Sequence, residues 1–227
     1  MTTITPYDVQ PGDKVNRGDP VTVDRHTPFV RVNHWTTAIT LILLTLSGLA
    51  LFHPSLFFLT DVFGGGENAR ALHPWLGVLM FVSFYGLFFR FWRACQFAAE
   101  DGRWLVKMPS FMVSGDEEKM PEVGRFNAGQ KMFFWAMAFM LIVMLVTGLG
   151  IWDQYFFPYT TIEAKRILVL LHSIFAILAI CGVIVHVSMV IWERGTLQAM
   201  TRGHVTGGWA WKHHRKWLRE LVLGGRS

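Results

Sequence analysis

Residues 167–192 read ILVLLHSIFAILAICGVIVHVSMVIW, and this stretch decides the fold. It contains no Asp, Glu, Lys or Arg. As a helix it would be about 39 Å long at about 1.5 Å per residue, which is enough to cross a hydrocarbon core of roughly 30 Å. Its only imidazoles are His172 and His186. The stretch therefore predicts a transmembrane helix that carries two histidines.

Three further runs, residues 35–52, 71–89 and 132–152, also lack Asp, Glu, Lys and Arg and are long enough to be membrane spans. The composition agrees, because 52% of the residues are hydrophobic and only 16% are charged, which is too apolar for a typical soluble domain. The predicted fold class is an all-α integral membrane protein, a transmembrane four-helix bundle. Its predicted domains are an N-terminal arm (1–30), a four-helix domain (31–194) and a C-terminal tail (195–227).

The distribution of basic residues predicts the orientation of the helices. Short cytoplasmic loops carry an excess of Lys and Arg, and here the excess lies before the first run, between the second and third, and after the fourth. Both termini are therefore expected in the cytoplasm of a multi-pass protein of the bacterial inner membrane. A cleaved signal peptide is not expected, because the 34 residues before the first run, which include four Asp, do not resemble a charged leader.

Cysteine chemistry is excluded as the basis of a metal site. Cys95 and Cys181 are too few and too far apart for a disulfide framework or an iron–sulfur cluster, and there is no C-x-x-C-H motif for covalent haem. Histidine is left as the ligand for a metal inside the membrane.

An internal similarity relates the two halves of the chain. Trp35 and Ser47-Gly48-Leu49 recur as Trp135 and Thr147-Gly148-Leu149 at an offset of 100, and Leu72-His73 recurs as Leu171-His172 at an offset of 99. The chain reads as two helical hairpins in a parallel repeat. The alternative is that the similarity is coincidental, because apolar helices are built from few residue types.

The spacing of His172 and His186 places them on one helix face. Fourteen residues of about 100° each bring the second side chain to within about 40° of the first, and roughly 21 Å along the axis separates them. Two stacked porphyrins at different depths would fit this spacing. The alternative is two histidines hydrogen-bonded to neighbouring helices.

Bis-histidine haem needs a second imidazole for each of these ligands. His34 opens the first span at the depth of His186, and His73 opens the second span at the depth of His172. The predicted pairs are His34 with His186 (the inner pair) and His73 with His172 (the outer pair). His53 competes on the outer side but is rotated about 100° from the face of His34. The remaining histidines, His26, His204, His213 and His214, lie in the arms, where a solvated or docking role is expected.

Two glycines and two arginines accompany the predicted ligands. Gly48, on the face of His34 one layer further out, and Gly148 would let a flat macrocycle approach, although glycine also serves ordinary helix packing in membranes. Arg31 and Arg70 each precede a predicted ligand by three residues and could contact haem propionates. Interfacial anchoring explains them equally well.

From about residue 29 to 217, the chain resembles the cytochrome b (gamma) subunit of respiratory formate dehydrogenases. The residues that carry the resemblance are Asn33-His34-Trp35, residues 69–74 (ARALHP), residues 124–131 (GRFNAGQK), the helix with His172 and His186, and residues 209–217 with Lys212-His213-His214. The polar segment before residue 25 and the tail after Trp217 depart from this pattern.

The resemblance implies cofactors and partners. The four histidines would ligate two haems b. The chain would anchor a complex in which a molybdenum or tungsten (alpha) subunit oxidises formate and an iron–sulfur (beta) subunit passes the electrons on. Electrons would enter the outer haem, cross to the inner haem and reduce a quinone, either menaquinone or ubiquinone, near the cytoplasm. A trimer of heterotrimers is a further level of assembly consistent with the family, and nucleic acid is not an expected partner.

The resemblance also suggests a quinone site at the start of the third helix. Asn127, Gly129 and Gln130 would form it together with His186. Two amides at a helix N-terminus can donate hydrogen bonds to a quinone carbonyl. Simple capping of the helix by Asn127 is the alternative.

Two rival functions remain open at this stage. The first is the cytochrome b subunit of a membrane-bound nickel–iron hydrogenase, or of another quinone-linked oxidoreductase, which would share the bis-histidine plan. The second is a transporter or a structural anchor. Transporters usually show ionisable residues or broken helices within their spans, whereas histidine is the ionisable side chain that matters within these spans.

Overall fold

The computed structural model describes residues 9–115 and 120–224. Four long helices dominate it: α1 (Pro28–Phe52), α2 (Gly66–Phe91), α4 (Ala128–Ile151) and α6 (Ile162–Trp192). The shorter elements, in chain order, are β1 (Lys14–Asn16), β2 (Thr22–Asp24), η1 (Pro54–Phe63), α3 (Ala99–Ser114), α5 (Asp153–Phe156), η3 (Phe157–Tyr159), α7 (Thr196–Thr201), β3 (His204–Thr206), α8 (Gly207–His213) and α9 (Arg215–Gly224).

The chain forms two compact units, each built from segments that are distant in sequence. The helical unit comprises Val32–Phe88 and Ala136–Val187. The second, which we call the polar unit, comprises Met1–Arg31, Phe89–Trp135 and Ser188–Ser227.

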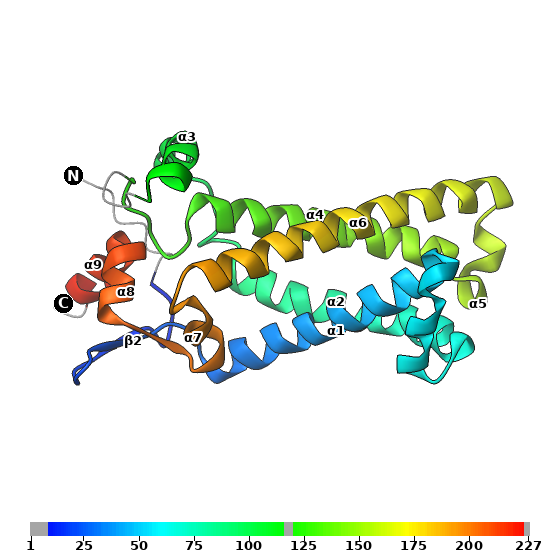
Figure 1. The fold of residues 1–227 in the computed structure, drawn as a ribbon, viewed down its shortest axis with the longest axis horizontal. Helices are drawn as coiled ribbons and strands as arrows, with labels where there is room; N and C mark the ends of the chain where they lie inside the picture. The colour runs from blue at the N-terminus through cyan, green and yellow to red at the C-terminus, as the bar shows by residue number, and fades with distance from the viewer. Residues whose placement is uncertain (1–8, 116–119, 225–227) are drawn as a thin grey trace. The chain divides into compact units, whose positions relative to one another are not determined.

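The helical unit is a bundle of two hairpins. Figure 1 shows the four long helices of this bundle. Side-chain hydrogen bonds join α1 to α2 and α4 to α6. The two hairpins meet where the Tyr85 hydroxyl donates to the Ala138 carbonyl oxygen at 2.8 Å. At one end the rings of Trp75, Trp152 and Tyr155 pack edge to face, as aromatic side chains do at a membrane interface.

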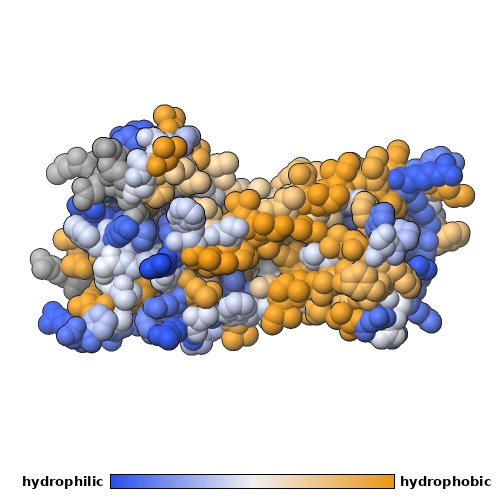
Figure 2. All heavy atoms as spheres, viewed as in Figure 1, coloured by the Kyte–Doolittle hydropathy of each residue, from blue (hydrophilic) through white to orange (hydrophobic). Residues whose placement is uncertain are grey.

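The outer surface of this bundle is apolar. Figure 2 shows hydrophobic side chains over the visible face of the long helices. In α6 only 6% of the most apolar stretch is buried within the protein, and all four helices have the length and hydropathy of membrane spans. The prediction of an all-α transmembrane protein with four spanning helices is confirmed.

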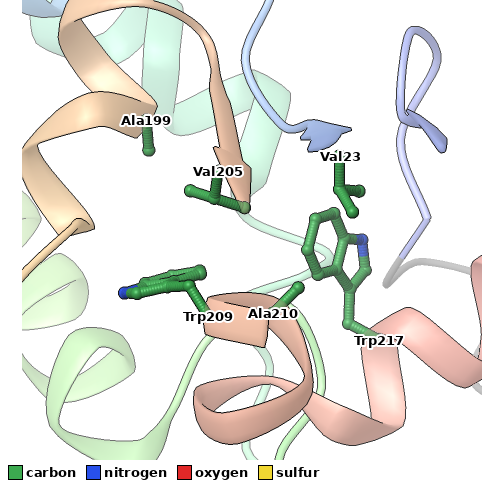
Figure 3. Close-up of a cluster of buried hydrophobic side chains, with 6 residues drawn as sticks. All are labelled: Val23, Ala199, Val205, Trp209, Ala210 and Trp217. Atoms are coloured by element: carbon green, nitrogen blue, oxygen red, sulfur yellow. The ribbon is translucent and has the colours of Figure 1, made fainter. Parts of the chain in front are cut away.

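The polar unit contains a small sheet of order β1-β2-β3, and both strand pairs are antiparallel. Val23 on β2 lies opposite Val205 on β3. Their side chains pack with Trp209 and Trp217 of the C-terminal helices in a buried hydrophobic cluster (Figure 3). The cluster holds the N-terminal strands and the C-terminal tail together.

A turn at Gly203 completes this arrangement. Its φ of 88° lies in the left-handed region, which glycine adopts without steric cost. The Gly203 carbonyl oxygen accepts hydrogen bonds from the backbone N–H groups of Arg25 and His26, at 2.8 and 3.0 Å. A side chain at this position would also meet the His26 carbonyl oxygen at 2.7 Å.

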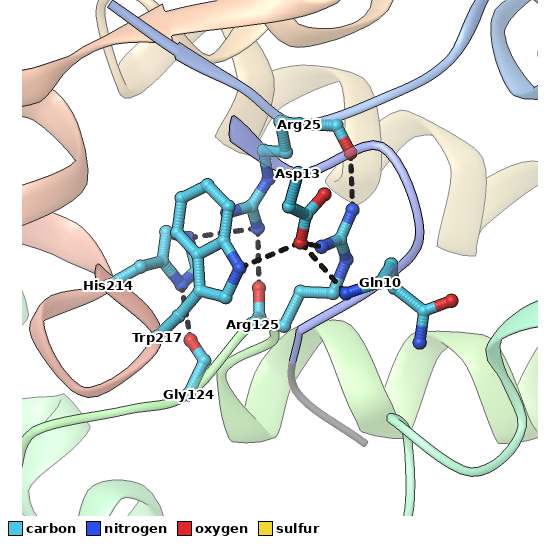
Figure 4. Close-up of polar contacts among 7 residues, drawn as sticks. All are labelled: Gln10, Asp13, Arg25, Gly124, Arg125, His214 and Trp217. Atoms are coloured by element: carbon cyan, nitrogen blue, oxygen red, sulfur yellow. Dashed lines mark hydrogen bonds and ion pairs between the residues drawn. The ribbon is translucent and has the colours of Figure 1, made fainter. Parts of the chain in front are cut away.

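A buried polar network lies beside the hydrophobic cluster (Figure 4). Arg125 forms an ion pair with Asp13, and the same carboxylate accepts from Trp217 Nε1 at 3.0 Å. The guanidinium of Arg25 lies 4.6 Å from the ring centroid of Trp217. Burial, together with the nearby charge of Arg125, lowers the pKa of Arg25 to about 9. The network therefore joins the N-terminal segment, the α3–α4 connection and the tail.

His214 belongs to this network and corrects one sequence-based expectation. Its side chain is 1% exposed, and its Nδ1 lies 2.8 Å from the Gly124 carbonyl oxygen. Burial, with Arg25 close by, holds the pKa of His214 well below its usual value. The expected solvated or docking role is wrong for His214, because the tail folds back onto the α3–α4 connection.

Candidate haem and quinone sites

The outer histidines are neighbours in the helical unit. The ring centroids of His73 on α2 and His172 on α6 lie 6.3 Å apart, and the ring planes make an angle of 66°. A metal–imidazole bond is about 2 Å long, and the ring centre lies about 1 Å beyond the nitrogen. Imidazoles on opposite sides of one metal ion therefore have centres about 6 Å apart. The observed spacing fits bis-histidine ligation.

Each outer histidine has a hydroxyl partner on the adjacent helix of its own hairpin. The Ser47 Oγ lies 2.7 Å from His73 Nδ1, and the Thr147 Oγ1 lies 2.9 Å from His172 Nδ1. Each hydroxyl also donates to the carbonyl oxygen four residues earlier in its helix, at 2.9 and 2.7 Å. A hydroxyl has one hydrogen, so assigning it to this carbonyl makes the imidazole the donor in the first contact. Nε2 is then left with the free lone pair that iron requires.

The glycines after these hydroxyl residues make room for the rings. A Cβ at Gly48 would lie 3.4 Å from His73 Cε1, and one at Gly148 would lie 3.3 Å from His172 Cε1. The predicted role of these glycines was to admit a macrocycle. The structure adds that they also admit the imidazole of the partner helix.

A large cavity surrounds the outer pair. Its volume is about 890 Å³, and its lining, mostly apolar, includes both outer histidines, Gly77 and Arg70. Cofactor and ligand sites typically measure about 300–1,000 Å³ and are apolar with a few polar groups. The residues present therefore fit a haem.

The inner histidines are also close to one another. His34 on α1 and His186 on α6 lie near enough for a direct electrostatic interaction. The Nδ1 of His34 is buried and has no hydrogen-bond partner among the described residues. The ring of His34 packs edge to face on Trp35 at 5.7 Å. The inner pair thus differs from the outer pair, because in the part of the chain that the structure describes the Nδ1 of His34 lacks the hydroxyl partner that both outer rings have.

Two other candidate residues have different contacts. His53 is exposed and caps η1, because its Nδ1 accepts from the backbone N–H of Ser55 at 3.2 Å. It does not line the cavity of the outer pair. Arg31 donates from Nη1 to the carbonyl oxygen of Thr201 at 2.6 Å within the polar unit.

The amides predicted for a quinone site form a capping box at the start of α4. Asn127 Oδ1 accepts from the Gln130 backbone N–H at 2.9 Å, and Gln130 Oε1 accepts from the Asn127 backbone N–H at 3.0 Å. This reciprocal pattern is a known helix start. Both side-chain oxygens accept hydrogen bonds from backbone N–H groups. The NH₂ groups of both amides therefore point away from the backbone. A Cβ at Gly129 would meet the ring of Trp104 at 3.4 Å.

The comparison with known families settles the class of protein. Residues 25–203 match the family described as prokaryotic cytochrome b561. The chain belongs to the prokaryotic cytochrome b561 family. A cytochrome b family implies haem b, and the matched region contains His34, His73, His172 and His186.

Individual relatives of this cytochrome b561-family chain are subunits of formate dehydrogenases. It is 40% identical over 200 residues to the cytochrome b556(fdo) subunit of Escherichia coli K12, which covers 88% of this chain and 93% of the relative. Identity to the nitrate-inducible cytochrome b556(Fdn) subunit of the same organism is 38%, with 86% and 90% covered. Identity to the cytochrome b556 subunit of formate dehydrogenase from Haemophilus influenzae is 36%, with 92% and 88% covered. The predicted resemblance is confirmed.

Sequence reasoning missed the hydroxyls of Ser47 and Thr147. Both residues were part of the recognised repeat, but only the glycines beside them were assigned a role. The usable signal was a hydroxyl at the same place in each half, with a histidine 26 and 25 residues later.

Proposed function

We propose that this chain is the di-haem cytochrome b subunit of a membrane-bound formate dehydrogenase. It would anchor the complex and carry electrons from an iron–sulfur subunit to a quinone. The observation that carries the proposal is the outer pair, where two imidazoles on different helices lie 6.3 Å apart in an apolar cavity. The names of the three relatives favour formate over hydrogen as the electron source.

Each haem has two proposed ligands, His73 with His172 and His34 with His186. When bound, the haems supply one-electron transfer along the bundle. The residues of the chain would hold each haem by two imidazole nitrogens, Nε2 in the outer pair, and would exclude water with an apolar lining and offer Arg70 to a propionate at the outer site. Arg31 is the corresponding proposal at the inner site, where its Nε has no hydrogen-bond partner among the described residues.

The proposed quinone site comprises Asn127, Gly129 and Gln130 together with His186. Its support is the capping box, because that box fixes both amide oxygens on backbone N–H groups. The NH₂ groups are then the donors that a quinone carbonyl needs. Capping and quinone binding are compatible roles for the same two side chains. Reduction of the quinone consumes two electrons and two protons.

The proposed setting is the bacterial inner membrane with both termini in the cytoplasm. The basic residues before α1, between α2 and α4 and after α6 support this orientation. Quinone reduction would occur on the cytoplasmic side. The proposed partners are the iron–sulfur (beta) and catalytic (alpha) subunits, and this chain is not the formate-oxidising subunit. A trimer of such heterotrimers is part of the same proposal.

Purification of the chain from its native membrane tests this proposal. We expect a reduced-minus-oxidised spectrum of haem b, two extractable haems per chain, and co-purifying iron–sulfur and molybdenum or tungsten subunits. Formate should then reduce an added quinone. Co-purification with hydrogenase subunits would instead support the hydrogen-linked alternative, and a chain without haem would refute an electron-transfer role.

A further inference from the structure

We propose that Ser47 and Thr147 are positioning residues that lower the midpoint potential of the outer haem relative to the inner haem. The inference rests on the proposed function, since it requires haem between His73 and His172. It assigns to two hydroxyls a role in directing electrons inward. Neither residue would touch the iron, and both would act through the ligand imidazoles.

The hydroxyls of Ser47 and Thr147 make the same two kinds of hydrogen bond. Each hydroxyl donates its hydrogen to a carbonyl oxygen of its own helix, at 2.9 Å for Ser47 and 2.7 Å for Thr147. With that hydrogen on the carbonyl, each hydroxyl accepts from the imidazole Nδ1–H. Both residues are buried, with 0% and 3% of their surface exposed, so water does not compete for these bonds.

These hydrogen bonds change the properties of the imidazoles as metal ligands. A hydrogen bond accepted from Nδ1–H orients the ring and raises the basicity of the opposite nitrogen. A more basic ligand stabilises the more positively charged ferric iron, which lowers the reduction potential. Because both ligands of the outer site have such an acceptor, the two effects act in the same direction.

The inner pair differs from the outer pair in this respect. His34 Nδ1 is buried without a hydrogen-bond partner among the described residues. One inner ligand thus lacks the acceptor that both outer ligands have. The inner haem is therefore expected at the higher potential, so that electron transfer from the outer to the inner site would release free energy.

Thr40 provides a matched control on the same helix as Ser47. It is buried (5% exposed), and its hydroxyl donates to the Thr36 carbonyl oxygen at 2.8 Å. Its hydrogen-bond contacts are backbone carbonyl oxygens of its own helix. Thr40→Val therefore removes a buried helix hydroxyl without touching a ligand ring.

The test is a spectroscopic redox titration of the purified complex carrying Ser47→Ala, Thr147→Val or Thr40→Val. The outer haem is identified as the one that is lost in His172→Ala. At a fixed potential, the reduced-to-oxidised ratio of the outer haem should rise roughly two- to tenfold in Ser47→Ala and in Thr147→Val, or up to about 59 mV for each substitution. Its low-spin EPR g values, which report ring orientation, should change as well. Thr40→Val should leave both measurements unchanged.

The conservative variants Ser47→Thr and Thr147→Ser keep the hydroxyl and should retain the original potential. If Ser47→Ala loses the outer haem, retention in Ser47→Thr still supports the positioning role, and loss in both overturns it. Unchanged potential and g values in haem-replete Ser47→Ala and Thr147→Val overturn it too, as does an equal shift in Thr40→Val. Absence of haem from the unmodified complex would refute the proposed function instead, so the two failures are distinguishable.

Discussion

Arg125 and Asp13 form a buried ion pair in the polar unit although 112 positions separate them in the sequence. Their side chains are 1% and 2% exposed. The Asp13 carboxylate also accepts hydrogen bonds from Trp217 Nε1 and from the Gln10 backbone N–H, both at 3.0 Å. One carboxylate thus connects the N-terminal segment, the α3–α4 connection and the tail.

Replacing Asp13 with Asn should destabilise the polar unit by about 3–5 kcal/mol, because removal of one partner leaves a buried charge uncompensated. The free energy of unfolding can be measured in detergent from tryptophan fluorescence, since Trp209 and Trp217 lie in the affected region. Lys165→Met is the control. It breaks an ion pair with Asp153, whose side chain is 64% exposed, and should cost less than about 1 kcal/mol. Equal losses in the two variants would contradict the structural role of Asp13.

The polar unit should lose stability as the pH falls below the usual histidine pKa of 6.5, because His214 resists protonation in the folded chain. Above that pH the imidazole is neutral in both states and contributes no pH dependence. Below it the unfolded chain binds the proton more readily, so the free energy of unfolding decreases. His214 donates from Nδ1 to the Gly124 carbonyl oxygen, and Nε2 faces Arg25 at 3.4 Å. His213 and Arg125, which lie nearby, also lower the pKa of His214.

Melting temperatures at pH 5 to 8, compared between the parent chain and His214→Gln, measure this effect. The glutamine amide can still donate to the Gly124 carbonyl oxygen but does not titrate. The decline at low pH should be shallower in the variant. Parallel curves would show that other groups cause the acid sensitivity.

Replacement of His172 with Ala should remove the outer haem and leave the inner haem in place. The reason is that its partner His73 would lose the second ligand, whereas His34 and His186 are unaffected. Pyridine haemochrome assay after acid–acetone extraction should fall from two haems per chain to one. His53→Ala is the control and should keep both haems. Retention of both haems in His172→Ala would show that another side chain ligates the outer iron.

Substitution of Asn127 by Ser separates capping from quinone binding. Serine is a good N-cap residue, so helix stability should be nearly unchanged, whereas Asn127→Ala should cost about 1 kcal/mol. Serine lacks the NH₂ group, so the rate of quinol formation should drop in both variants. Haem content and formate-to-dye activity should stay normal. Normal quinone reduction in Asn127→Ser would leave the residue with the capping role alone.

Electron transfer to a cytoplasmic quinone site should generate a membrane potential. Moving each electron inward against about 150 mV costs roughly 3.5 kcal/mol, or about 7 kcal/mol for the pair. In sealed vesicles of known orientation that carry an opposing potential, an ionophore should accelerate formate-dependent quinone reduction. If the ionophore does not change the rate and formate oxidation generates no membrane potential, quinone reduction takes place on the outer side.

The membrane part of the fold could be predicted from the sequence because the bilayer imposes a strong constraint on it. A charge-free run such as 167–192 must be a helix in lipid, since each backbone group needs an internal partner there. The polar unit could not be predicted in this way. Its sheet pairs Val23 with Val205, and strands of three residues separated by most of the chain leave no periodic pattern.

The four histidines proposed as ligands could be selected from the sequence, and the structure brings the rings of His73 and His172 together. Helical spacing placed His172 on one face with His186, and matching depth selected His73 over His53. The partners of the rings were not predictable, because a serine in a membrane helix most often satisfies itself through the backbone of its own helix. Ser47 does this as well, at 2.9 Å. Its contact with His73 depends on the distance and rotation between two helices, which the sequence does not state.

The outer pair follows the internal repeat of the chain, which bears on how this site could have evolved. His73 and His172 occupy equivalent places in the two hairpins, and each has its hydroxyl partner. A single hairpin associated with its own copy about a twofold axis would therefore supply both ligands of the outer haem. The inner pair breaks the repeat, because the positions that correspond to His34 and His186 hold Phe134 and Leu87. Duplication of one hairpin would account for the proposed outer haem site, whereas the proposed inner site, and with it the proposed quinone chemistry, would require the two halves to have diverged.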